Sequence, residues 1–187
     1  MSSRPTRYRR RRPPFLFLAF LAKDELDAID GFVEFTREAR ISRKRRLERQ
    51  AAGHAPDKDY LVHAYAQLDG FAALSAEFAI IGLWRCVELS KATAIRTERA
   101  FARAAGILPD GIPRRVRCAR SVNELRCLNN AIKHGGRVNG DLADFPRWRG
   151  KKGRKLGNLE GHYARLRSAA DRYVRDLAGR LSRRTPF

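Results

Sequence analysis

The stretch Ser121-Val-Asn-Glu-Leu-Arg-Cys-Leu-Asn-Asn-Ala-Ile-Lys-His-Gly-Gly136 carries signals for both ends of a helix. Ser121 followed three residues later by Glu124 is typical of a capping box, in which each side chain binds a free backbone N–H at the helix start. Gly135 and Gly136 predict the end, because glycine readily adopts the left-handed conformation that closes many helices. The stretch therefore predicts a short helix within an α-helical fold.

Residues four apart share one face of this helix, so its polar residues form a stripe beside its apolar ones. The stripe contains Arg126, Asn130 and His134, with Asn129 and Lys133 on its flank. A histidine can move a proton near neutral pH, an amide can orient it, and a cation can stabilise charge that builds on a phosphate. These groups suffice for metal-independent cleavage of a phosphodiester by an adjacent 2′-hydroxyl. The alternative is a histidine that only interacts with the helix dipole and the last carbonyls.

Apolar residues recur at three- and four-residue spacing in three further segments, which predicts three more helices. They run from about 15 to 49, from about 57 to 105 and from about 158 to 181. The sequence leaves open whether residues 15–21 begin the first helix or form a separate extended segment. An unbroken second helix would be about 70 Å long, which is too long for a compact domain of this size. We therefore expect a bend or break there, with Gly70 and Gly82 as candidates.

Strand signals are almost absent, so the expected fold is an all-α bundle of four to five helices. Residues 1–13 are basic and contain prolines, which predicts a flexible arm, and residues 14–187 form the expected single domain. The apolar run that follows the arm is too short for a membrane span and lacks a convincing cleavage site. A first core element is therefore expected there, with no membrane partner.

The charge of the chain favours an anionic partner. The 187 residues include 40 Lys and Arg against 20 Asp and Glu, a net charge of +20, and Arg outnumbers Lys. Nucleic acid is the leading candidate, because guanidinium groups bind phosphate in a bidentate way. The unpaired cysteines Cys86, Cys118 and Cys127 argue against a disulfide framework and for a reducing, cytoplasmic setting. Neither they nor the histidines show metal-ligand spacing, so no metal or cofactor is expected.

A long basic loop is expected at 135–157, before the last helix. A loop of this length in a small domain is usually functional or disordered. Its candidate nucleic-acid-binding residues are Arg147, Trp148, Arg149, Lys151, Lys152, Arg154 and Lys155. Trp148 can stack on an unpaired base while the cations hold phosphates. The alternative is a solvated loop with Trp148 packed against the core.

The segment Asn130-Ala-Ile-Lys-His134, which follows a leucine-rich turn and ends in glycine, resembles the signature helix of HEPN domains. The preceding Leu83-Trp-Arg-Cys-Val-Glu-Leu89 resembles their long helix. The resemblance implies a helical, often dimeric bundle, and many HEPN domains are metal-independent ribonucleases of toxin–antitoxin and defence systems. It assigns His134 as acid or base and Asn130 as the group that orients it. The family has an arginine where this chain has Asn129, and Arg126 or Lys133 are the candidate replacements.

Three functions are consistent with these features. The first is an RNA-binding or RNA-cleaving protein, with RNA, a second copy of the chain and a possible antitoxin as partners. The second is a non-catalytic helical adaptor that dimerises or holds another protein, which the asparagine at position 129 favours. The third is a basic coat or ribosome-associated protein, in which His134 has no role.

Overall fold

The computed structural model describes residues 14–53, 57–105 and 116–184, and every named element in these ranges is a helix. The helices are α1 (Pro14–Gly53), α2 (Lys58–Ala105), α3 (Ala119–Lys133), α4 (Gly140–Ala143) and α5 (Leu159–Arg184). The expected all-α bundle is thereby confirmed for the described residues. Residues 15–21 belong to α1, which resolves the alternative that the sequence left open. The basic arm at 1–13 lies outside the described residues.

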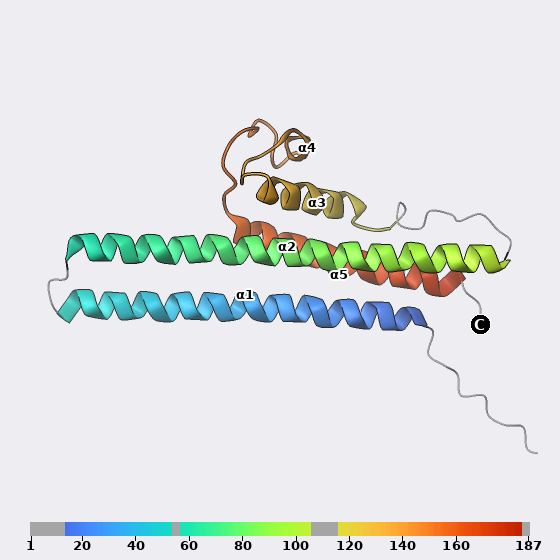
Figure 1. Cartoon of the computed structure of the whole chain (residues 1–187), viewed down its shortest axis with the longest axis horizontal. Coiled ribbons are helices and arrows are strands. Elements are labelled where there is room, and N and C mark those ends of the chain that lie inside the picture. Colours follow the sequence, from blue (N-terminus) through green and yellow to red (C-terminus); the bar gives the residue numbers. More distant parts are fainter. Residues whose placement is uncertain (1–13, 54–56, 106–115, 185–187) are drawn as a thin grey trace, which may run out of the picture.

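The two longest helices, α1 and α2, form an antiparallel hairpin that sets the length of the molecule (Figure 1). Helix α5 packs against both of them, and α3 packs against α2 and α5. The end of the hairpin near the 53–58 connection extends past the other helices, so that it is a two-helix rod there (Figure 1). The molecule is therefore elongated.

The expected bend in α2 was wrong, because α2 is one continuous helix of 48 residues. Both candidate breakers lie inside it. A glycine in a helix costs only about 1 kcal/mol relative to alanine, and the packing of α2 along α1 outweighs that amount. Gly82 also has a packing role, since a Cβ there would lie 3.3 Å from the side chain of Ile29 on α1. The length argument failed because it assumed a compact domain.

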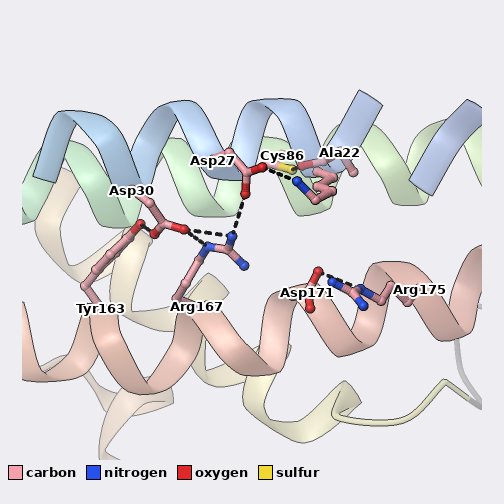
Figure 2. Close-up of polar contacts among 9 residues, drawn as sticks. Ala22, Asp27, Asp30, Cys86, Tyr163, Arg167, Asp171 and Arg175 are labelled. Carbon is pink, nitrogen blue, oxygen red and sulfur yellow. Dashed lines mark hydrogen bonds and ion pairs between the residues drawn. The ribbon is translucent and has the colours of Figure 1, made fainter. Parts of the chain in front are cut away.

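A cluster of polar contacts joins α1 to α5 (Figure 2). Arg167 of α5 donates through Nε to Oδ2 of Asp30 at 2.9 Å, and its Nη2 lies 3.6 Å from Oδ1 of Asp27. Tyr163, one turn earlier on α5, donates its hydroxyl to the same Asp30 carboxylate. These contacts lie beside the apolar core, in which Leu26 and Leu166 are almost fully buried. These contacts fix the position of α5 along the axis of α1.

The predicted capping box at the start of α3 was also wrong. The helix begins at Ala119, and Cys118 before it adopts a left-handed φ of 61° without a side-chain capping bond. Ser121 therefore lies within the first turn, and Glu124 is buried, with 7% of its surface exposed. The Glu124 carboxylate binds residues far along the chain instead.

Candidate nucleic-acid interface

The carboxyl end of α3 closes at the predicted glycines. Gly135 has φ 108° and Gly136 has φ 65°, both in the region that favours glycine. The N–H of Gly136 donates to the carbonyl of Ala131 at 3.0 Å, and the N–H of His134 donates to that of Asn130 at 3.0 Å. These bonds satisfy two carbonyls in the last turn of the helix, and the side chains of Lys133 and His134 are exposed.

Backbone hydrogen bonds tie this helix end to the segment before α5. The N–H of Leu156 donates to the Gly136 carbonyl at 2.8 Å, and the N–H of Val138 donates to the Arg154 carbonyl at 2.9 Å. Gly153 in turn donates to the Val138 carbonyl at 2.8 Å. The two ends of the 135–157 loop therefore lie side by side, next to the end of α3.

The 135–157 loop, which the sequence predicted as a long functional or disordered connection, packs as part of the fold. It contains the short helix α4 and a series of turns. Its apolar side chains are buried, namely Val138, Leu142, Phe145, Trp148 and Leu156. A loop that buries these side chains presents its polar residues in a fixed arrangement, because their backbone cannot move independently of the core.

Trp148 is not available to stack on a base, which corrects its assignment as a nucleic-acid-binding residue. Only 3% of its surface is exposed, and its ring stacks on that of His162 with centroids 4.3 Å apart. Its indole N–H donates to Oε1 of Glu124 at 2.9 Å. The alternative of a tryptophan packed against the core therefore holds.

Glu124 connects three elements of the fold. Besides accepting the Trp148 indole N–H, its carboxylate accepts from both terminal nitrogens of Arg165 on α5, at 2.6 and 3.0 Å. This bidentate geometry is the strongest form of an arginine–carboxylate contact. Sequence analysis missed this role of Glu124, although its spacing of four from the core residue Leu128 could have shown that it faces inward.

His162 is the buried titratable group of this cluster. It is 8% exposed, and its Nδ1 has no hydrogen-bond partner among the described residues. Burial, and to a lesser extent the nearby Arg165 guanidinium, lowers the pKa of His162 to about 4. The His162 imidazole is therefore neutral in the folded protein at neutral pH.

The protein should lose stability as the pH falls from 6.5 towards 4. The pKa of His162 is about 4 in the folded state against 6.5 for an unperturbed histidine, so between these values the unfolded chain binds more protons. The contribution is fully present above pH 6.5, and we expect a loss of about 2–3 kcal/mol near pH 4. Urea titrations at several pH values measure it. A His162→Phe variant should show a flatter profile over this window, and an unchanged profile would contradict the assignment.

The cationic side chains of the loop are exposed. The six that were assigned to nucleic-acid binding are Arg147, Arg149, Lys151, Lys152, Arg154 and Lys155. None of them forms an ion pair with a carboxylate in the described part of the chain. The Nζ of Lys151 lies 5.9 Å from the centre of the Trp148 ring, so the buried indole also makes a cation–π contact with this lysine. We call these cations, together with Lys133 and His134, the basic surface.

The predicted catalytic set is only partly accessible. His134 and Lys133 are exposed and Asn130 is half-buried, but Asn129 is 1% exposed. The Nδ2 of Asn129 lies 3.4 Å from Oδ1 of Asn130, and its own Oδ1 has no partner among the described residues. Asn129 therefore lies in the core, where it cannot contact a substrate.

Arg126, the candidate replacement for the missing arginine, is exposed but turned towards the start of α3. Its Nε donates to Oδ1 of Asn123 at 3.0 Å, and its Nη2 lies 3.6 Å from the sulfur of Cys127. No contact joins Arg126 to His134 among the described residues. The bond from Leu156 to Gly136 ties the end of α3, where His134 lies, to the last part of the loop, whereas Arg126 bonds towards the start of the helix.

The described residues contain no group of three His, Cys, Asp or Glu that could hold a metal ion. Their cysteines are free, and burial raises the pKa of Cys86 to about 12, so its thiol stays protonated. One stretch of α2, Lys58–Ala100, is long and apolar enough to cross a membrane by length and composition. This is weak evidence, because the core helix of a soluble protein passes the same test.

Comparison with known proteins identified no relative. No protein-family model, curated protein or solved structure matches this chain.

Proposed function

We propose that this protein binds RNA through the basic surface formed by the 135–157 loop and the end of α3. The observation that carries the proposal is that cations on the loop are exposed without carboxylate partners, while the backbone beneath them is held by buried side chains. Unpaired cations attract phosphates and release the counterions bound to them. A fixed arrangement lowers the entropy lost on binding.

The resemblance to HEPN domains adds a second candidate, which is metal-independent cleavage of RNA in a toxin–antitoxin or defence setting. Exposure of the His134 imidazole at the edge of the basic surface favours it. Burial of Asn129 and the contact of Arg126 with Asn123 favour binding without turnover. Binding without cleavage would also suit an adaptor or a coat protein, and we propose binding as the main activity.

Titration of mixed single-stranded RNA into the purified protein at several salt concentrations tests the binding. With about six phosphate contacts, log K should fall against log salt with a slope of about −4, a loss of about 300-fold between about 50 and 200 mM. A slope near zero would contradict a phosphate-binding surface.

Incubation of the same RNA with protein in chelator, beside a His134→Ala variant, tests cleavage. Fragments that end in a cyclic phosphate, formed by the unmodified protein and not by His134→Ala, would support the nuclease. Equal RNA integrity with both proteins removes the nuclease and leaves RNA binding as the function.

A further inference from the structure

The α1–α2 hairpin exposes large apolar side chains on both of its helices. On α1 they include Phe32, which is 41% exposed, and Phe35, which is 68% exposed. On α2 they include Phe71, Leu74 and Phe78, which are 43%, 54% and 61% exposed. A contiguous exposed apolar patch of this kind on a soluble protein usually marks an interaction site.

These side chains lie on one face of the hairpin, which we call the apolar face. At roughly 100° per residue, Phe71, Leu74 and Phe78 fall on the opposite side of α2 from its buried residues Ile80 and Leu83. The same spacing places Phe32 and Phe35 roughly on the opposite side of α1 from Asp30, which contacts α5.

Helices α3 and α5 therefore cover one face of the hairpin and leave the apolar face open. The open face follows a seam of alternating three- and four-residue steps on α1. Its members are Leu21, Glu25, Ala28, Phe32, Phe35, Ala39, Ser42 and Arg46, all of them exposed. Such a seam is the pattern by which two helices pack side by side.

The seam on α1 is symmetric about the point midway between Phe32 and Phe35. In an antiparallel pair centred there, Phe32 meets Phe35 of the other helix, and Ala28 meets Ala39. In these two central pairs, large residues face large ones and small residues face small ones. A second copy of the same helix provides both of these pairs twice, once on each side of a two-fold axis.

The apolar residues of α2 share the same centre. Ile29 lies against Gly82, and the Ala22 carbonyl accepts from the Cys86 thiol, which aligns the two helices along the hairpin. The midpoint of the α1 seam is therefore level with about Ala76, which is also the midpoint between Leu74 and Phe78. One two-fold axis across the hairpin thus pairs α1 with α1 and α2 with α2.

Charge supports the same pairing. Two acidic residues on or beside the α1 seam, Asp24 and Glu25, precede the apolar centre, and two basic residues there, Arg43 and Arg46, follow it. Antiparallel pairing about the midpoint places each acidic end of one copy beside the basic end of the other. This arrangement opposes the repulsion that a net charge of +20 otherwise causes between copies.

We propose that the apolar face is the interface of a homodimer, in which two hairpins pair into an antiparallel four-helix bundle. Because α3 and α5 lie on the other side of each hairpin, the two basic surfaces face outward and remain separate. The dimer thus has two separate binding surfaces for a polyanion. The His134 residues of the two copies do not meet at a shared site. The interface itself rests on the apolar and charged residues of the hairpin and is independent of the RNA proposal.

Mass measurement by light scattering tests the dimer. The chain has a mass of 21.3 kDa, and we expect about twice that value for the unmodified protein. Phe35→Glu and Phe78→Glu, at exposed positions, should each give the monomer mass with unchanged helical content. Asp24→Arg alone and Arg43→Asp alone should weaken the dimer, and the double variant should restore it, because residues 24 and 43 face each other across the axis and their charges then exchange places. A monomer mass for the unmodified protein overturns the proposal.

Cysteine crosslinking tests the register. The double variant Ala28→Cys/Ala39→Cys should form disulfide-linked dimers on mild oxidation, because each new thiol meets the other position across the axis. Either single variant should not, and Phe35→Glu added to the double variant should abolish the crosslink. Equal crosslinking by the single variants overturns the antiparallel register. Flotation of a monomer with anionic lipid vesicles, lost in Phe35→Glu, would assign the face to a membrane and likewise overturn the dimer.

Discussion

Replacement of Trp148 by alanine should lower the free energy of unfolding by about 3–5 kcal/mol. Trp148 is buried, stacks on His162 and donates to Glu124, so the change creates a cavity under the loop and removes a hydrogen bond from a buried carboxylate. Urea denaturation followed by circular dichroism measures the loss. The loop should detach before the helices unfold, and hydrogen exchange at 137–156 should increase first.

Two matched variants separate the contributions to this loss. Trp148→Phe keeps most of the apolar volume and removes the indole N–H, so we expect about 1–2 kcal/mol. Glu124→Gln keeps an acceptor for Trp148 and removes the charge that Arg165 binds. A loss below about 1 kcal/mol in Trp148→Ala would mean that the indole does not hold the loop.

Neutralising the loop cations should remove most of the affinity for RNA. The variant replaces Arg147, Arg149, Lys151, Lys152, Arg154 and Lys155 with glutamine. Each lost phosphate contact lowers the salt slope by roughly 0.7, so the slope should approach zero and affinity at low salt should fall about 100-fold or more. The fold should survive, because these side chains are exposed and have no carboxylate partners among the described residues.

A second variant with the same change in net charge controls for non-specific attraction. It replaces exposed cations elsewhere on the described helices, namely Lys91, Arg99, Arg103, Arg120, Arg172 and Arg183. We expect this variant to keep its salt slope to within about one. Equal losses in the two variants would mean that the whole charge of the chain attracts RNA and that the loop has no special role.

The sequence predicted the helices well, because their burial follows a regular spacing. Leu166, Tyr173 and Leu177 are buried along one side of α5, as the apolar periodicity of that segment indicated. The end of α3 was also predicted, since a left-handed turn at Gly135 and Gly136 depends on local chemistry alone.

The errors arose where contacts distant in sequence outweigh local patterns. Glu124 fits a capping box locally, but Arg165, which is 41 residues away, binds its carboxylate instead. The sequence is equally consistent with an exposed and a buried Trp148, because the environment of this side chain depends on where α5 places His162. Burial of Asn129 likewise follows from the packing of α3 against its neighbours, which spacing on one helix does not reveal.

Photo-crosslinking of RNA to the protein, followed by mass spectrometry of the linked peptides, tests the central claim most directly. If the loop and the end of α3 form the RNA-binding surface, crosslinks should concentrate between Lys133 and Lys155. Crosslinks confined to the basic part of α1 at 43–49, with none in the loop, would contradict it.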